Sequence, residues 1–404
     1  MNQEPRTAPP GRWSDERLSE VRRHLHSHPE LSGQEHATAA FIAARLTELG
    51  LSPRVGLDGA DTGVVAMVEG EAGDGPTLLW RADIDALPIV ELNEAPYRSC
   101  APGVMHACGH DVHTTIGLGL ASALVARRAG LRGRVKLVFQ PAEEGTPGEG
   151  VVGAEAMALG GVLEGVDAAF AVHCAPAMPV GTIGYNREAM WAGSDVWTAT
   201  LEGTSTHGAY PQDGVDPIFV AAQVVLGLQG IVGRVIDTRA ACVISVGQIE
   251  AGTAFNIIPG AVRMVGLLRT LDEGTRERAM AAIERLVNGT CAAWGARAEL
   301  RFARGAHVTV MDGATVDRVV DALRKTVGGD HLVPVKAQMG AEDFASFSRR
   351  VPSAYLQLGV GNVEHGIVHP IHSPRFDADE RCLAFAVEHL ASALLDVAAG
   401  MVRP

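Results

Sequence analysis

The sequence predicts an α/β protein with a larger domain, whose mixed and partly parallel sheet is flanked by helices, and a smaller α+β domain inserted into it. The chain has 404 residues, which is too long for one ordinary hydrophobic core. Short apolar, β-branched segments alternate with helical patterns in the first and last parts of the chain. Between about residues 190 and 304 the order becomes β-α-β-β-α-β, which is typical of a ferredoxin-like sandwich.

The first elements are two helices and four strands. Ser14 is the expected N-cap of the first helix, and the second helix is expected over residues 35–49, where Gly50 ends it. The strands are expected at residues 63–68, 77–80, 134–139 and 168–172, with a helix over residues 114–128 between the second and the third. Their apolar character predicts that helices cover both faces of the sheet.

Polar side chains follow three of these strands. Asp83 and Asp85 come after the second strand. Glu143 and Glu144 come after the third, and His173 comes after the fourth. Parallel strands would bring these side chains to one edge of the sheet, which is where open α/β sheets place their sites.

The inserted domain is expected to hold four strands and two helices. In chain order these are a strand at residues 196–201, a helix at 216–232, strands at 242–249 and 262–268, a helix at 272–294 and a strand at 298–302. The α/β pattern then resumes and ends in a helix over residues 379–399. We therefore expect residues 1–189 and 305–404 to form the larger domain and residues 190–304 to form the inserted one.

Composition argues against several partners. The formal net charge of −13 disfavours nucleic acid or an anionic membrane as the main partner. No apolar run approaches the ~18 residues of a membrane span, and the N-terminus has no apolar signal-peptide core. The six cysteines include no CxxC pair and indicate reduced thiols, so we expect a cytoplasmic protein.

Residues 105–113 read MHACGHDVH and concentrate side chains that bind metals. Cys108 and His110 lie two positions apart, which puts a thiolate and an imidazole on one side of an extended or turning backbone. Zinc accepts both sulfur and nitrogen ligands. Taken alone, the stretch is equally compatible with an incidental turn rich in cysteine and histidine.

Glu143 and Glu144 in QPAEEG offer a metal ligand and a base beside it, which hydrolysis at a metal site needs. Adjacent carboxylates on a regular strand point to opposite faces, so the pair can serve both roles only if the backbone bends. Considered singly, the pair could be a solvated acidic turn. His173 could be a core histidine, and His372 could lie in a surface turn.

Together these segments resemble the zinc-dependent aminoacylase-type amidohydrolases, a family that includes hippurate hydrolase and plant auxin-conjugate hydrolases. The resemblance covers nearly the whole chain and rests on motifs in a fixed order. They are RRHLHSHPELSGQE (22–35), RADIDALP (81–88), MHACGHD (105–111), QPAEEG (140–145), THGAYPQDGVDP (206–217), FNIIP (255–259), GAEDF (340–344) and IHSP (371–374). Chance agreement of so many ordered motifs is negligible.

The resemblance implies a two-metal site in the larger, catalytic domain. Carried over position by position, the ligands are Cys108, which matches the bridging position, His110, Glu144, His173 and His372. Glu143 matches the general base, which takes a proton from the attacking water and passes it to the leaving nitrogen.

The resemblance also implies that the inserted domain is a lid and dimerisation domain that contributes to the site. His207 matches a histidine that reaches the active site, usually that of the partner subunit. Asn256 and Arg269 match residues that contact the carboxylate side of the substrate. Without the resemblance, a surface histidine, a loop-capping asparagine and an exposed strand arginine are the simpler interpretations.

Other residues have supporting or open roles. Asp83, Asp85 and Asp111 are expected to orient the ligands. Glu342 is expected either to contact substrate or to brace the site. The family often has GGHGA where this chain has STHGA, and Trp191 stands in the hinge region where methionine is common. These departures remove no ligand.

We therefore predict an enzyme with two divalent metal ions that cleaves the amide bond of an N-acyl amino acid, of hippurate-like, N-acetyl or aryl-acyl type. Zinc is the expected metal, with manganese, cobalt and nickel as alternatives, and a homodimer or higher homo-oligomer is expected. Two other functions stay open: a dipeptidase or carboxypeptidase of the same fold, and a non-catalytic binding protein. The latter should have lost a ligand or the base, and all six residues are present.

Overall fold

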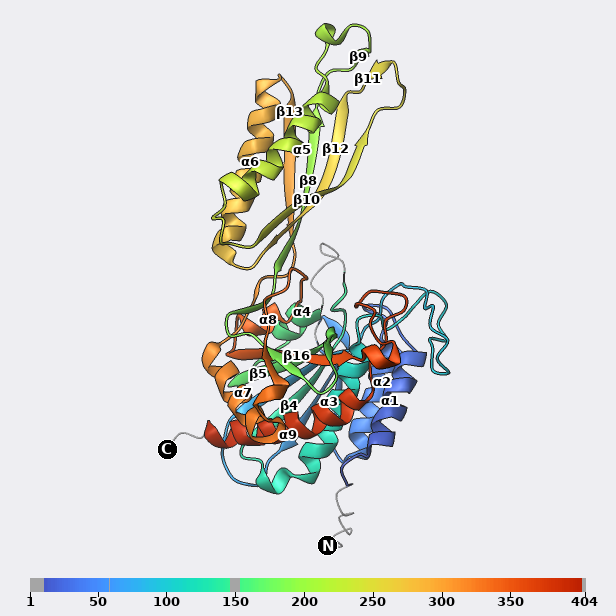
Figure 1. The fold of residues 1–404 in the computed structure, drawn as a ribbon, viewed down its shortest axis with the longest axis vertical. Coiled ribbons are helices and arrows are strands. Elements are labelled where there is room, and N and C mark those ends of the chain that lie inside the picture. The colour runs from blue at the N-terminus through green and yellow to red at the C-terminus, as the bar shows by residue number, and fades with distance from the viewer. Residues whose placement is uncertain (1–10, 58, 146–152, 402–404) are drawn as a thin grey trace.

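The computed structural model describes residues 11–57, 59–145 and 153–401, and Figure 1 shows them as a broad body and a narrower one that extends from it. Each body has its own cluster of buried apolar side chains. The broad body contains the first helices, the long sheet and the C-terminal helix, while the narrow body contains the middle of the chain.

An eight-stranded mixed sheet organises the broad body, with the strand order β1-β2-β4-β3-β5-β16-β6-β15. The bounds are β1 (Arg54–Leu57), β2 (Ala60–Glu69), β3 (Thr77–Asp83), β4 (Arg134–Gln140), β5 (Ala168–Pro179), β6 (Ile183–Tyr185), β15 (Leu332–Pro334) and β16 (Ser353–Gly361). The central strands β4, β3, β5 and β16 run parallel to one another, whereas β1 and β2 pair antiparallel at one side. The central strands therefore direct their carboxyl ends to the same edge.

Helices flank this sheet. They are α1 (Asp15–Ser27), α2 (His36–Glu48), α3 (His110–Ala126), α4 (Gly153–Leu159), α7 (Gly313–Val327), α8 (Ala345–Ser348) and α9 (Arg381–Gly400). The Ser14 side chain caps α1 as expected, by accepting from the amide of Arg17. The predicted α/β class, with a mixed and partly parallel sheet between helices, is confirmed.

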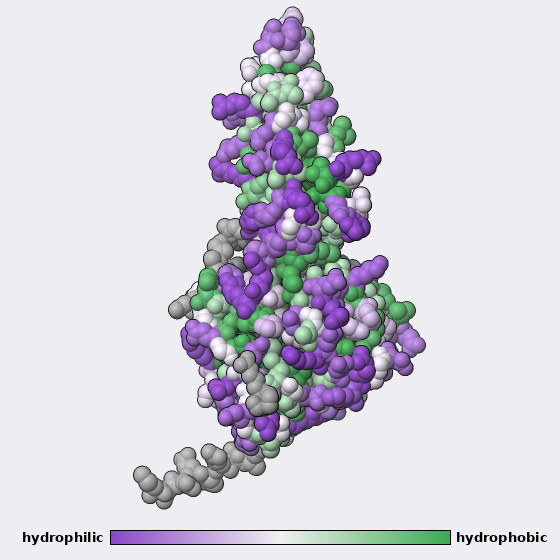
Figure 2. All heavy atoms as spheres, turned by 90° about the vertical axis from the view of Figure 1, so that its left-hand side faces the viewer, coloured by the Kyte–Doolittle hydropathy of each residue, from purple (hydrophilic) through white to green (hydrophobic). Residues whose placement is uncertain are grey.

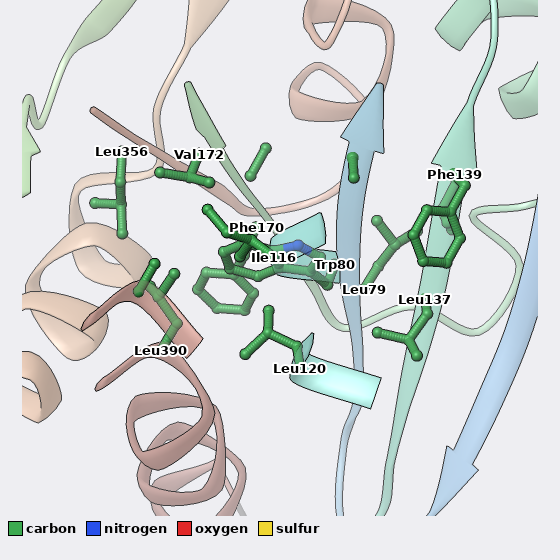
Figure 3. Close-up of a cluster of buried hydrophobic side chains, with 14 of the residues drawn as sticks. Leu79, Trp80, Ile116, Leu120, Leu137, Phe139, Phe170, Val172, Leu356 and Leu390 are labelled. Carbon is green, nitrogen blue, oxygen red and sulfur yellow. The ribbon is translucent and has the colours of Figure 1, made fainter. Parts of the chain in front are cut away.

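Helix α3 is buried along almost its whole length, which explains why it is almost entirely apolar from Ile116 onward. It packs on β3, α1 and α9. Gly117 allows the close approach to the sheet, because a Cβ there would come within 2.8 Å of the Phe139 ring. Figure 3 shows Ile116 and Leu120 of this helix beside Trp80 of β3. This packing fixes the amino end of α3 at the carboxyl edge of the parallel strands.

The narrow body is a four-stranded antiparallel sheet, with the order β10-β12-β8-β13, against which two helices pack. Its elements are β8 (Gly193–Glu202), α5 (Pro217–Arg234), β10 (Cys242–Ala251), β12 (Ala261–Thr270), α6 (Glu273–Ala293) and β13 (Arg297–Arg304). Trp197 lies at the centre of the core between sheet and helices and is fully buried. Two short pairs, β9 (Thr206–His207) with β11 (Ile257–Ile258) and β7 (Ala189–Trp191) with β14 (Thr309–Val310), complete the described strands.

Two described helices, α5 and α9, are long and apolar enough to cross a membrane by length and composition alone. The broad body accounts for the hydropathy of α9, which packs against α3 and α7. Helix α5 lies on the sheet of the narrow body and buries residues such as Val220 and Val224 there, so part of its apolar character also serves a core.

Several boundaries differ from expectation, and three of them lie at the site. Strand β3 extends to Asp83, so this residue ends the strand instead of following it. Helix α3 begins at His110 rather than at Thr114, because Gly109 adopts a φ of 89° and starts the helix four residues earlier. Strand β5 continues to Pro179 because it pairs with β16 well beyond Val172. His173, expected at the end of its strand, therefore lies inside it.

Candidate metal centre

The turn between Cys108 and His110 places both side chains at the amino end of α3. Gly109 is required between them, because its φ of 89° lies in the left-handed region and a Cβ would come within 2.8 Å of the Cys174 sulfur. Cys108 Sγ lies 3.4 Å from Nε2 of His173, which reaches the same point from β5. A thiol and an imidazole from distant parts of the chain thus face each other.

Hydrogen bonds orient both buried imidazoles. Nδ1 of His110 donates to the carbonyl oxygen of Asp85 at 2.9 Å, and Nδ1 of His173 donates to the carbonyl oxygen of Cys174 at 2.9 Å. Nε2 of each ring is thereby directed into the site, and Nε2 of His110 is buried with no hydrogen-bond partner among the described residues. Metal-binding histidines are held in this manner.

A bend in the backbone separates the roles of Glu143 and Glu144. Ala142 has a φ of 52°, and its amide donates to the buried Glu35 carboxylate at 2.8 Å. The amide of Glu144 donates to Asp85 at 2.9 Å. The bend that two different functions of the pair require is therefore present.

His372 enters from a loop near the C-terminus and has a φ of 62°. Its amide donates to the carbonyl oxygen of Ala107 at 2.8 Å, and its Nε2 lies 3.2 Å from Oε1 of Glu144. In the described chain, Ala142 and His372 are the non-glycine residues with positive φ. Left-handed non-glycine residues cost of order 1–3 kcal/mol and cluster at functional sites, so strain is stored next to this centre.

The six residues form overlapping groups whose ligand atoms lie within 4.8 Å of one another. These groups are Cys108 with His110 and His173, Cys108 with Glu144 and His372, and His110 with Glu143 and Glu144. Cys108, His110 and Glu144 each belong to two of these groups, so the groups form one continuous cluster that is compatible with a bridging Cys108. The donor set of one sulfur, three imidazole nitrogens and carboxylate oxygens suits zinc-like divalent cations. Nε2 of His110 and Oε1 of Glu144 are buried without a hydrogen bond among the described residues, and such cations would give both atoms a partner.

The charges of the protein are consistent with cation binding. Burial, together with the carboxylates of Glu144 and Glu143, raises the pKa of the Cys108 thiol. Burial lowers the pKa of His173 to about 3, so this ring is neutral as a ligand must be. Burial also disfavours the charged His110, but the Asp83 and Asp85 carboxylates outweigh it and raise its pKa to about 10. A divalent cation would take the place of these protons.

Glu143 is set apart from Glu144 by its surroundings. Burial and the neighbouring carboxylates of Glu342 and Glu144 raise the pKa of Glu143 well above its ordinary value. A carboxylate whose pKa is raised toward neutrality is a better proton carrier at neutral pH than an ordinary one. This environment is compatible with the predicted role of Glu143 as a base.

A buried arginine holds the carboxylates around the base, and sequence reasoning missed it. Arg81 is 1% exposed and donates to Asp83 at 2.6 Å, to Glu342 at 2.8 Å and to Asp343 at 2.9 Å. Tyr355 donates to the second oxygen of Glu342. A charged residue directly after the apolar run TLLW was the available signal. Glu342 therefore braces the site through Arg81 and also lines the cavity described below.

The three aspartates expected behind the ligands differ in role. Asp85 contacts His110 directly, with Oδ1 3.1 Å from Nδ1. Asp83 accepts from His113 at 2.6 Å, and Nε2 of His113 accepts from the amide of Cys174 at 2.8 Å. Asp111 points elsewhere and accepts from Arg22 and His26 on α1, both at 2.8 Å. Asp111 thus anchors α1 to α3 and contacts no predicted ligand.

A cavity of about 790 Å³ opens beside this centre. Cys108, Glu143, Glu144, His173 and His372 line it, together with Trp191 and Arg269. The structure does not bring His207 and Asn256 to this cavity. They lie at or next to β9 and β11, at the far end of the narrow body (Figure 1).

Comparison with known proteins identifies a matching family model and relatives that align over nearly the whole chain. A family model described as peptidase family M20/M25/M40 matches residues 79–396. The N-acetylcysteine deacetylase of Bacillus subtilis (strain 168) is 36% identical over 375 residues, which cover 93% of this chain and 95% of that protein. Thermostable carboxypeptidase 2 of Saccharolobus solfataricus is 36% identical over 381 residues and 94% of each chain. A Bacillus subtilis crystal structure described as a dinuclear metal-binding peptidase from the M20 family is 34% identical, with a TM-score of 0.83 and 96% and 99% coverage of the two chains.

Proposed function

The chain belongs to peptidase family M20/M25/M40 and is a metal-dependent amidohydrolase of that family, and we propose that it hydrolyses N-acyl amino acids to a carboxylic acid and a free amino acid. The observation that carries the proposal is the bend at Ala142. It supports a division of roles, with Glu144 as a ligand and Glu143, which lies among the carboxylates of Glu342 and Asp343, as the base.

The ligands of two divalent ions would be Cys108, His110, Glu144, His173 and His372, with Cys108 as the bridge. When bound, such ions supply Lewis-acid activation of water and of the amide carbonyl. We propose zinc as the resident metal on the basis of the sulfur and imidazole donors, with manganese, cobalt and nickel as alternatives. Metal analysis of protein purified from its natural host distinguishes these ions.

Glu143 would move the protons of the reaction. Its carboxylate takes a proton from the attacking water and delivers it to the leaving nitrogen as the C–N bond breaks. Arg81 fixes Glu342 and Asp343 next to Glu143, so the polar groups around the base are held before substrate arrives. Arg269, on the cavity wall, would bind the carboxylate of the substrate, with Asn256 contributing to the same side of the substrate when the site closes.

We further propose that residues 190–304 are an inserted lid and dimerisation domain between the catalytic parts 1–189 and 305–404. The narrow body exposes large apolar side chains, among them Leu226 at 69%, and Figure 2 shows apolar atoms reaching its surface. A dimer through this body would cover them. It would also allow the partner subunit's His207 to reach the cavity, which His207 does not reach within one chain.

The protein is proposed to act in the cytoplasm as a homodimer or larger homo-oligomer. Six free cysteines in the described chain are consistent with a reducing compartment. Sedimentation velocity at micromolar concentration tests the oligomeric state, and a monomer would contradict it.

The decisive test of function is a substrate panel on metal-loaded protein. N-acetyl and N-benzoyl amino acids should be hydrolysed, and Glu143→Gln should lower kcat by a factor of about 10² or more. Wild-type turnover by that variant would refute the role of Glu143. The relation to a carboxypeptidase supports a second candidate, cleavage of peptides at the C-terminus. Activity on dipeptides alone would favour it over the first.

A further inference from the structure

The cavity next to the metal centre is lined by four arginines, and two of them are neutralised. Arg304 pairs with Glu277, with contacts of 2.6 and 2.8 Å. Arg350 pairs with Glu155, with contacts of 2.8 and 2.6 Å. These two guanidinium groups need no anion from a ligand.

The other two, Arg269 and Arg349, have no ion-pair partner in the part of the chain that the structure describes. Nη1 of Arg269 is buried and has no hydrogen-bond partner among those residues. Burial of this guanidinium disfavours its charge and lowers its pKa. An unsatisfied buried donor is costly, so this group is suited to an anion that arrives with the substrate. Arg349 is exposed and lines the same cavity from the end of α8.

Among the described residues, none of the carboxylates that line the cavity, Glu143 and Glu155 included, forms an ion pair with either of these two cations. Glu342 and Asp343 are held by Arg81, and Glu144 faces His372 in the metal centre. The whole chain carries a formal net charge of −13, which repels anions at long range. Two guanidinium groups on one cavity, both without an ion pair among the described residues, therefore give this cavity a local affinity for anions.

Resting on the function proposed above, we propose that this site selects dianionic N-acyl amino acids, with one carboxylate on Arg269 and a second on Arg349. The second carboxylate belongs either to the side chain of a dicarboxylic amino acid or to a dicarboxylic acyl group. The cavity of about 790 Å³ is in the range of small-molecule sites and accommodates either. Arg349 is then a specificity residue for the same hydrolysis.

Matched substrate pairs test the proposal and separate the two sources of charge. N-acetylglutamate is compared with N-acetylglutamine, and N-succinylmethionine with N-butyrylmethionine, on the metal-loaded enzyme. The dianion of at least one pair should have the higher kcat/KM. Arg349→Gln should lower the ratio of kcat/KM for the dianion to kcat/KM for its monoanionic partner by about two- to fivefold, the range for an exposed ion pair. Arg349→Lys, which keeps the charge, should retain most of the preference for the dianion.

Arg318→Gln is the control for a simple loss of one positive charge. Arg318 lies on the exposed face of α7 and does not line the cavity. This variant should leave the ratio unchanged. Equal kcat/KM within both wild-type pairs, or an unchanged ratio in Arg349→Gln, overturns the inference.

Failure of the proposed function gives a different result. If no N-acyl amino acid is hydrolysed, calorimetric binding of the same four compounds to metal-loaded Glu143→Gln still tests the two arginines. Tighter binding of a dianion, lost in a Glu143→Gln/Arg349→Gln double variant, supports the anion site even without turnover. Equal binding within both pairs contradicts it.

Discussion

Glu143, the proposed base, should destabilise the metal-free fold at neutral pH, so Glu143→Gln should stabilise that fold. The Glu143 carboxylate lies with those of Glu342 and Asp343 in a group of atoms within 4.8 Å, and its side chain is 9% exposed. Like charges about 5 Å apart repel by ~3 kcal/mol at an effective dielectric constant of 20. Arg81 offsets much of this repulsion, because it forms ion pairs with Glu342 and Asp343. We therefore expect the Glu143 carboxylate to lower the unfolding free energy of the metal-free protein by about 1–2 kcal/mol.

The sign follows from proton linkage. Burial and the neighbouring carboxylates raise the pKa of Glu143 in the folded protein above the unfolded value, which is about 4.3. The folded state therefore binds more protons than the unfolded state between these two pKa values, and stability falls as the pH rises through that window. Below about pH 4 both states are protonated, and the substitution should have little effect.

Thermal unfolding of chelator-treated protein at pH 4 and pH 8 measures this difference. At pH 8 Glu143→Gln should unfold about 1–4 °C higher than the wild type. Glu284→Gln is the matched control, because Glu284 lies on the exposed side of α6 and should change little. A variant that is less stable than the wild type at pH 8, or a gain of the same size at pH 4, would refute the reasoning.

Three further predictions follow from the support of the ligands. Gly109→Ala forces a Cβ to within 2.8 Å of the Cys174 sulfur at a φ of 89°, so it should cost about 2 kcal/mol or more in unfolding free energy and reduce bound metal measured by mass spectrometry. Asp85→Asn should weaken metal affinity by about 10- to 100-fold in a chelator competition assay, whereas equal affinity would show that the contact with His110 is dispensable. Arg81→Met leaves Asp83, Glu342 and Asp343 without their shared cation and should lower the unfolding free energy by about 3–5 kcal/mol in a urea titration, more than the exposed control Arg318→Met.

Periodicity predicted the main helices and strands as far as residue 304 and the last helix, but it did not locate α7 or the central strand β16 individually, and it missed the boundaries at the site. The apolar run after Gly117 indicates a helix, yet α3 starts at His110, because buried polar residues interrupt the pattern there and are satisfied by distant partners. Strand β5 passes through His173 and ends at Pro179. Cys174 and Pro176 obscure this continuation in the sequence. In the structure it pairs with the neighbouring strand β16.

The site itself could be predicted locally only for Cys108 and His110. The order of the strands predicted that Glu144 and His173 reach one edge of the sheet. Their role as ligands, and the place of His372 beside them, were assigned by resemblance. Arg81 shows why the sequence alone could not identify every residue of the site. Its partner Glu342 lies 261 positions away, so a buried guanidinium looks like the polar end of a strand until the chain is folded.

The same dispersion gives the metals a structural role in this fold. Cys108, His173 and His372 come from the start of α3, from β5 and from a C-terminal loop, so a shared cation would tie three segments that the chain separates. Without it, the centre contains positive-φ backbone at Ala142 and His372 and carboxylates in close proximity, and each of these features disfavours folding. A ligand that binds only the folded state adds RT ln(1 + [L]/Kd), about 2.7 kcal/mol at 100 times Kd, which is comparable to these costs. Bound ions would therefore offset the cost of the strained backbone and the close carboxylates, and they would help to maintain the geometry that the proposed hydrolysis needs.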